Sequence, residues 1–269
     1  MPDSDLVSGV VAEVLRSPRH RWLASDVVTR VAATESPKAR TQADAVKRTK
    51  RRLHQAFGAY LGDLRPEAAL DQLTAAWRSA DPGAFEQVCR HLLAQHASTR
   101  ERLPVLETFY REIFAHTGRP RVLLDLACGL NPLALPWMNL APGARYLACD
   151  ADRRLVLLVR GFLEMLGVAH AVELCDLVAG PPPGNADVAL LLKSVPCLER
   201  QERGSARRLL AGLAARYVVV SFSTRSLGGA ARGMVEHYRG EMRALLRGLD
   251  RQATEVRFPS ELVFVLSAE

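Results

Sequence analysis

The sequence predicts an α/β fold in which a Rossmann-like, doubly wound sheet follows an all-helical N-terminal domain. Over residues 5–116, apolar residues recur at the three- and four-residue spacing of amphipathic helices. From Arg121 onward, short apolar runs typical of buried strands alternate with helical segments. A glycine-containing turn follows the first of these runs. This order of elements is typical of a largely parallel sheet with helices on both faces.

The helical part contains several start signals. The expected helices include a basic one from Pro37 toward Tyr60 and two more over Pro66–Trp77 and Asp81–Ala94. Ser98-Thr-Arg-Glu101 has the pattern of a capping box and is expected to begin a helix that continues to Gly118. The predicted division is a helical domain over residues 1–100 and a sheet domain over residues 101–269.

The sheet part contains seven strand-like runs. Five strands are expected at Val122–Leu126, Ala144–Cys149, Val172–Cys175, Val188–Leu192 and Tyr217–Phe222. Two more, Thr254–Phe258 and Leu262–Leu266, are expected to form an antiparallel edge.

The turn after the first strand indicates a nucleoside-binding site. Gly129 lets the backbone approach a ligand closely. Asp150 lies 21 residues later, at the end of the second apolar run, where a carboxylate can accept hydrogen bonds from both ribose hydroxyls. The full G-x-G-x-x-G fingerprint is absent, because its place reads Ala127-Cys-Gly-Leu-Asn-Pro132. A dinucleotide brings a pyrophosphate that needs those glycines, whereas S-adenosylmethionine has an adenosine and no phosphate. The pattern therefore favours a class I methyltransferase over a dehydrogenase.

Composition excludes several classes of protein. With 269 residues, 48% hydrophobic and 24% charged, the chain is long enough for two packed domains and unlike a disordered protein. No apolar run reaches the roughly 20 residues that cross a bilayer, and the first residues lack the pattern of a secretory signal. Five scattered cysteines without a C-x-x-C pair argue against disulfides and zinc. We expect a cytoplasmic monomer that binds neither a membrane nor a metal.

The positive charge is concentrated in one segment. The chain carries +7, and residues 37–55 hold seven basic residues and one acid, which gives +6. The basic residues are Lys38, Arg40, Lys47, Arg48, Lys50, Arg51 and Arg52. A charge run is usually a solvated helix face, but the rest of this chain is nearly neutral. The segment therefore predicts a footprint for a polyanion such as RNA; membrane binding is the rival, which the modest apolar face of the helix disfavours.

Five motifs occur in a fixed order over most of the chain. They are Leu53-His-Gln-Ala-Phe-Gly-Ala-Tyr60, His96-Ala-Ser-Thr-Arg-Glu-Arg102, Asp125-Leu-Ala-Cys-Gly-Leu-Asn-Pro-Leu133, Lys193-Ser-Val-Pro-Cys-Leu-Glu-Arg200 and Ser221-Phe-Ser-Thr-Arg-Ser-Leu-Gly-Gly229. Together they resemble the aminoglycoside-resistance 16S rRNA methyltransferases, in the branch that methylates N7 of guanine-1405 in the decoding site. The resemblance implies S-adenosyl-L-methionine as methyl donor, S-adenosyl-L-homocysteine as product, and 16S rRNA within the assembled 30S subunit as substrate.

Cofactor roles follow from chemistry and this resemblance together. The expected cofactor-binding residues are Tyr60, His96, Ala97, Ser98, Arg102, Ala127, Gly129, Asp150, Asp176, Leu177, Leu192 and Gln201. Arg102, with free N–H groups near Ser98, is expected to hold the methionine carboxylate. Asp176 and Leu177 are expected to meet adenine, with a plain N-cap role for Asp176 as the alternative. Tyr60 and His96 have packed, hydrogen-bonded roles as their alternatives.

The resemblance also implies residues at the RNA face. Lys193 and Glu199 are expected to position the target base or its phosphate, although a lysine leaving a strand end for solvent is the simpler account. Arg225 and Ser226, after the fifth strand, are expected to touch RNA. Glu261 is expected to brace that loop, with an exposed strand position as the alternative.

Methylation at guanine N7 needs no general base, because this nitrogen already has an in-plane lone pair. No catalytic residue is therefore expected: catalysis rests on aligning N7 with the methyl group, and a neutral-to-acidic wall helps as the base gains positive charge. Pro196-Cys197 resembles the Pro-Cys of cytosine-C5 methyltransferases, in which a thiolate attacks the base. No neighbour in sequence lowers the pKa of Cys197, so we expect this residue to be a small apolar filler.

Three other functions remain open. A sister enzyme acting at N1 of adenine-1408 is one, although such family members lack the long helical domain. A small-molecule methyltransferase is another, but it would not need a basic helix remote from the cofactor. An RNA-binding protein with a vestigial methyltransferase fold is the third, and it would not need Arg102, Asp150 and Asp176.

Overall fold

A seven-stranded sheet forms the centre of the molecule. The computed structural model describes residues 4–58, 64–224 and 231–268. The strands are β1 (Val122–Leu126), β2 (Arg145–Asp150), β3 (Ala169–Leu174), β4 (Ala186–Leu192), β5 (Ala215–Ser223), β6 (Arg251–Phe258) and β7 (Glu261–Ala268). Their order is β3-β2-β1-β4-β5-β7-β6, with β1 to β5 parallel and β7 antiparallel to both its neighbours. The predicted Rossmann-like methyltransferase sheet and its antiparallel edge are confirmed.

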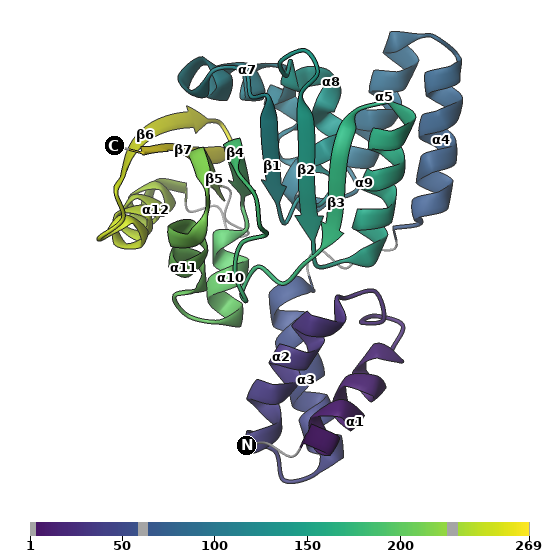
Figure 1. The fold of residues 1–269 in the computed structure, drawn as a ribbon, viewed down its shortest axis with the longest axis vertical. Coiled ribbons are helices and arrows are strands. Elements are labelled where there is room, and N and C mark those ends of the chain that lie inside the picture. Colours follow the sequence, from purple (N-terminus) through teal and green to yellow (C-terminus); the bar gives the residue numbers. More distant parts are fainter. Residues whose placement is uncertain (1–3, 59–63, 225–230, 269) are drawn as a thin grey trace.

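Helices cover both faces of this sheet (Figure 1). On one face lie α4 (Pro66–Arg78), α5 (Pro82–Leu93), α7 (Leu106–Thr117), η3 (Asn131–Ala134), α8 (Leu135–Met138) and α9 (Arg153–Met165). On the other lie α10 (Val195–Gln201), α11 (Ser205–Gly212) and α12 (Ala231–Leu246). Strand β4 shows why both faces need helices. Leu190 and Leu192 belong to the hydrophobic core on the α9 face, and Leu191 belongs to the core on the α11 face. Parallel strands that are apolar on both faces need such cover.

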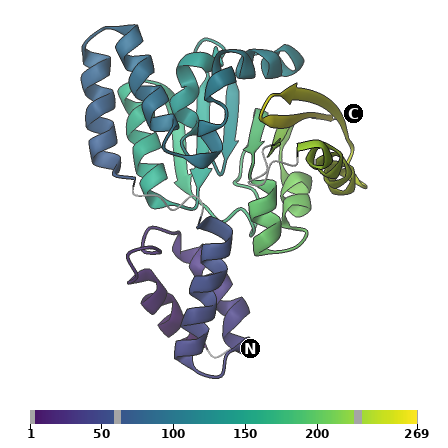
Figure 2. The same cartoon turned by 180° about the vertical axis from the view of Figure 1, so that it is seen from behind.

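The first three helices form a separate packing unit. They are α1 (Ser4–Leu15), α2 (Ser25–Glu35) and α3 (Gln42–Phe57), and they enclose a hydrophobic cluster of their own. Both views show this unit beyond one end of the sheet, with α10 as the nearest helix of the sheet part (Figures 1 and 2). Helices α4 and α5 instead share the core of the sheet. The change of core thus lies between α3 and α4 rather than at residue 100, and an independent N-terminal domain stays a prediction.

The basic helix begins later than the sequence suggested. Pro37 lies in a short 3-10 turn, η1 (Ser36–Lys38), and Ala39 is extended. Helix α3 starts at Gln42, where the Thr41 hydroxyl accepts from the Asp44 N–H at 3.2 Å. A threonine N-cap stabilises the start of a helix. The helix therefore begins after Thr41 and not at Pro37. Tyr60, at the expected end of this helix, lies outside the described residues.

The prediction that a capping box at Ser98 begins a long helix is wrong. A single turn, α6 (Ala97–Arg100), is followed by η2 (Leu103–Val105), and α7 begins only at Leu106. The Ser98 hydroxyl contacts Nδ1 of His96 at 2.7 Å and makes no cap contact. Pro104 explains the break, because a proline disfavours helical geometry at the residue before it and lacks an N–H. Arg102 therefore lies between two short turns and not in the first turn of a long helix.

Candidate functional site

A cavity of about 800 Å³, counting its opening to solvent, lies at the carboxyl edge of the sheet. The expected residues that line it are His96, Ser98, Ala127, Gly129, Asp150, Asp176, Leu177, Leu192, Lys193 and Gln201. Ala97 and Arg102 do not line it. Residues from widely separated motifs thus meet in one place, as predicted for a doubly wound sheet.

Asp150 is fixed by the backbone around it. Its Oδ2 accepts from the Gly129 N–H at 2.9 Å and its Oδ1 from the Asp152 N–H at 2.9 Å. Gly129 has a φ of 53°, and a Cβ there would lie 3.1 Å from Cε1 of His96. Ala127 has a φ of 49°, which is strained for a residue with a side chain. Such strain at a cavity wall is typical of a site where the backbone must approach a ligand.

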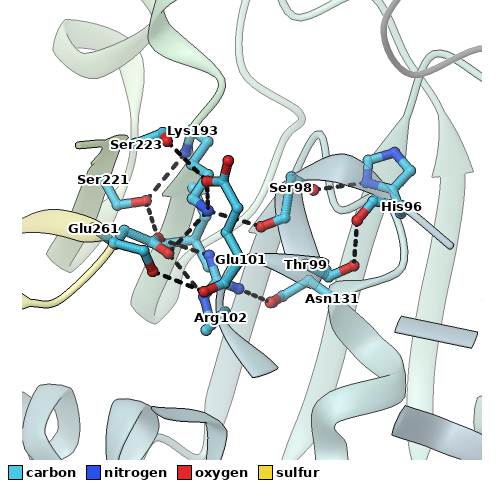
Figure 3. A network of polar contacts seen from close by, with 12 residues as sticks. His96, Ser98, Thr99, Glu101, Arg102, Asn131, Lys193, Ser221, Ser223 and Glu261 are labelled. Carbon is cyan, nitrogen blue, oxygen red and sulfur yellow. Dashed lines mark hydrogen bonds and ion pairs between the residues drawn. The ribbon is translucent and has the colours of Figure 1, made fainter. Parts of the chain in front are cut away.

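A buried ionic network lies behind the cavity (Figure 3). Arg102 donates from Nη2 and Nε to Glu261 at 2.7 and 3.2 Å, and from Nη1 to Oδ1 of Asn131 at 2.6 Å. Lys193 donates to Glu101 at 2.9 Å and pairs with Glu261 at 3.2 Å. The guanidinium expected at a methionine carboxylate is therefore already held by protein acceptors, and its role there stays a prediction.

Glu261 is the acid at the centre of this network. It is fully buried, so the alternative of an exposed strand position is wrong. Burial alone would raise the pKa of Glu261, but Arg102 and Lys193 outweigh it and lower the pKa below its ordinary value. Its Oε1 also accepts from the Ser221 hydroxyl. Glu261 thus contacts β5 through Ser221, whereas the loop that it was expected to brace contains Arg225 and Ser226, which lie outside the described residues.

Two of the N–H groups near Ser98 are engaged within the protein, and a role of this segment at the methionine carboxylate stays a prediction. The N–H groups of Thr99 and Arg100 both donate to the carbonyl of His96, at 3.2 and 2.9 Å. His96 is only partly exposed, and desolvation by the surrounding protein lowers its pKa to about 4. It is therefore neutral near pH 7 and adds no positive charge to the cavity.

The N-terminal unit supplies part of the cavity wall. Leu23, Val27 and Phe57 line it, and none was expected from sequence. Main-chain bonds from Ala24 N–H to the Ala151 carbonyl and from Arg153 N–H to the Trp22 carbonyl, both 2.8 Å, hold this segment against the end of β2. Apolar residues at helical spacing usually indicate a core, so no sequence signal distinguished these three as cavity residues.

Comparisons with known proteins place the chain in a family. A model of the ribosomal RNA methyltransferase (FmrO) family matches residues 16–265. The chain belongs to this family. A 16S rRNA (guanine(1405)-N(7))-methyltransferase of Micromonospora echinospora is 40% identical over 97% of each chain, and one of Frankia casuarinae is 41% identical over 97% of this chain and 93% of its own. The crystal structure of the 16S rRNA methyltransferase RmtF with S-adenosyl-L-homocysteine is 33% identical, with a TM-score of 0.85 over 99% of this chain and 100% of that one.

In this FmrO-family chain, the side chains of Lys193 and Glu199 lie in different places, and only Lys193 lines the cavity. Lys193 lines the cavity with a φ of 58°, and its ammonium donates to the Ser98 carbonyl at 2.9 Å. Both carboxylate oxygens of Glu199 instead accept from the N–H groups of Gly204 and Ala206, at 2.8 and 2.9 Å. Glu199 thus stabilises the start of α11 and does not line the cavity. The structure gives no support for Glu199 at the target base.

The basic face of the FmrO-family chain is partly engaged within the protein. The exposed cations of the expected set are Lys38, Arg40, Lys47 and Arg51. Arg48 lies 3.5 Å from Glu35, and Arg52 donates to the Gln201 carbonyl at 3.2 Å. The loop between α1 and α2 adds three exposed cations that sequence reasoning missed, namely Arg16, Arg19 and Arg21. Their spacing, three arginines within six residues, was an available signal.

Cys197 contacts the N-terminal unit and lines the cavity. Its thiol donates to the Ala56 carbonyl at 3.2 Å, and burial raises its pKa to about 11. The thiol is therefore protonated near pH 7, which disfavours a nucleophilic role. We expect Cys197→Ser to keep at least about half of the wild-type methylation rate, since serine preserves the hydrogen-bond donor. A single-turnover assay measures this; near-total loss together with a trappable covalent RNA adduct in the wild type would contradict it.

The pH dependence of ligand binding tests the ribose role of Asp150. Burial raises the pKa of Asp150 to about 6. Only the ionised carboxylate accepts two hydroxyl donors, so binding must expel its proton at low pH. We expect the affinity for S-adenosyl-L-homocysteine to be constant above about pH 7 and to fall roughly tenfold for each pH unit below about 6. Calorimetric titration between pH 5 and 8 measures this.

Asp150→Asn is the matched control for that profile. It replaces the carboxyl of Asp150 and leaves the other two carboxylates that line the cavity, Asp152 and Asp176, unchanged. The variant should bind more weakly at pH 8 and show a flat profile. A wild-type profile that is itself flat would contradict the assignment.

No helix in the described ranges is long and apolar enough to cross a membrane. Over the same ranges, no three His, Cys, Asp or Glu residues gather as a metal site would require.

Proposed function

We propose that this protein is a 16S rRNA (guanine(1405)-N(7))-methyltransferase that uses S-adenosyl-L-methionine and leaves S-adenosyl-L-homocysteine. The observation that carries the proposal is the similarity to enzymes of that name, at 40% identity over 97% of the chain, which extends through both the N-terminal unit and the cavity. The assembled 30S subunit is its substrate, and aminoglycoside resistance is the consequence. We further infer a monomer that works in the cytoplasm.

The cavity has the features that this cofactor needs. Asp150 presents a carboxylate at the end of β2, where it can accept hydrogen bonds from the ribose hydroxyls of an adenosine. The tight turn at Gly129 lets the chain pass close to the ligand. Among the charged residues of the wall, Asp152 pairs with Arg154 and Asp176 with Arg30, while the charge of Lys193 is balanced by Glu101 and Glu261. The wall therefore keeps a net negative charge at Asp150.

The reaction needs alignment more than proton transfer. S-adenosyl-L-methionine supplies a methyl group on a positively charged sulfur. Guanine N7 attacks with its lone pair, so no residue of this chain has to remove a proton. An acidic wall stabilises the positive charge that the base gains, and holding the two reactants in line supplies the remaining advantage. Because N7 is stacked within a helix, we expect the base to be flipped into the cavity.

Mapping the modification on the ribosome tests the proposal. 16S rRNA from cells that express the protein should carry one added methyl group at guanine-1405, visible by mass mapping and by primer extension after cleavage at N7-methylguanine. Cells that express Asp150→Ala should lack it. A methyl group at N1 of adenine-1408 instead, or unmodified 16S rRNA with the wild-type protein present, would overturn the proposal.

A further inference from the structure

Arg30 is a side chain of α2 that reaches the carboxyl edge of the sheet. Its Nε and Nη2 donate to the two carboxylate oxygens of Asp176 at 2.5 and 3.0 Å, and Nη2 also donates to Oε1 of Gln201 at 2.8 Å. The planar guanidinium matches a carboxylate in this two-pronged arrangement. One residue of the N-terminal unit therefore ties together two residues that line the cavity.

The geometry leaves Asp176 one acceptor position. Its side chain is 4% exposed, and its Oδ1 accepts from the Val178 N–H at 3.1 Å as well as from Arg30. A carboxylate offers about four acceptor positions, two on each oxygen. Three are used, and the fourth is on Oδ2. Arg30 does not line the cavity, so it orients this last position without taking the space of a ligand.

The same unit is attached to the cavity loops elsewhere. Leu23 forms an isolated antiparallel bridge with Asp152, after β2. Arg52 donates to the Gln201 carbonyl at the end of α10. Arg30 thus belongs to a unit that contacts the cavity wall at three places, Asp152 after β2, Asp176 after β3 and Gln201 at the end of α10.

We propose that Arg30 is a positioning residue for adenine recognition. It holds Asp176 so that Oδ2 accepts from the exocyclic amino group of the adenine, and it holds Gln201 beside it. This inference rests on the proposed function, in which the cavity binds S-adenosyl-L-methionine. A 6-oxo base has no hydrogen to donate at that position and directs an oxygen at the carboxylate. Arg30 therefore contributes to the choice of an adenosyl over an inosyl ligand.

Calorimetric titration of the full chain with S-adenosyl-L-homocysteine and with S-inosyl-L-homocysteine tests this. We expect the wild type to prefer the adenosyl ligand by on the order of a hundredfold. Arg30→Met should weaken adenosyl binding about tenfold while inosyl binding changes little, so that the preference shrinks. Arg30→Lys keeps the positive charge but cannot make the two-pronged contact with Asp176, and should give an intermediate preference. Arg111→Met, which removes an exposed arginine on α7, is the matched control and should leave both affinities unchanged.

The outcomes separate this inference from the proposed function. If the wild type binds neither ligand, both the proposed function and the inference are wrong. If the wild type binds the adenosyl ligand and Arg30→Met weakens both ligands equally, Arg30 is merely structural and the inference is wrong. An unchanged preference in Arg30→Met, or a wild type without preference, also overturns it. Should Arg30→Met fail to fold, the preference of Arg30→Lys decides alone.

Discussion

Asp150→Ala is expected to weaken binding of S-adenosyl-L-homocysteine by at least roughly a hundredfold, because two charge-assisted hydrogen bonds to the ribose, together worth about 3 kcal/mol, are lost. The variant also loses the acceptor for the Gly129 and Asp152 N–H groups, which loosens the turn that approaches the ligand. Calorimetric titration at pH 8 measures the affinity. An unchanged dissociation constant would refute the ribose role.

Asp187→Ala is the matched control for that variant. Asp187 also accepts from two backbone N–H groups, those of Arg121 and Val122 at 2.7 and 2.9 Å, but at the opposite edge of the sheet. We expect a similar loss of thermal stability in both variants and a loss of ligand binding only in Asp150→Ala. Equal loss of binding in both would attribute the effect to general destabilisation.

Charge reversal on the basic face should separate RNA docking from cofactor binding. Lys47, Lys50 and Arg51 lie within about one turn of α3 and make no contact with the cavity. Changing all three to glutamate is expected to weaken association with 30S subunits on the order of a hundredfold at about 0.15 M salt, because phosphate contacts are replaced by repulsion. The slope of log affinity against log salt should fall by about 3. Sedimentation or filter binding across a salt series measures both.

The affinity of this triple variant for S-adenosyl-L-homocysteine should equal that of the wild type. A second triple variant, with Arg78, Arg111 and Arg145 changed to glutamate, makes the same change in net charge away from α3. It should lose far less affinity for the subunit. Equal losses in the two triple variants would show that overall charge matters and that the basic face has no special role.

The strands and the turn at Gly129 were predictable because their signals are local. A buried strand is a short apolar run, and the distance from Gly129 to Asp150 along the chain reflects one strand–helix–strand step. Errors arose where two local signals competed. The sequence around Ser98 has the pattern of a helix start, but Pro104 prevents a long helix from forming there. Pro37 has a similar signal, but the basic helix begins after Thr41, which caps it.

The buried polar groups were not predictable for a different reason. Arg102 and Glu261 lie 159 residues apart in the chain, and Arg30 and Asp176 lie 146 apart. Nothing in the spacing of either pair indicates that they meet, because the fold alone brings them together. The contacts of Glu199 with the N–H groups of Gly204 and Ala206 were not predicted either, and its role at the target base, which the family resemblance implies, stays a prediction.

Strand β7 comes last among the seven strands in chain order but lies between β5 and β6. During synthesis, one edge of β5 therefore stays unpaired until residues 261–268 have left the exit tunnel. Arg102 and Lys193 likewise gain the carboxylate of Glu261 only at that moment. The ionic network behind the cavity can therefore form only after the chain has been synthesised through β7, so its assembly depends on the strand that comes last in chain order.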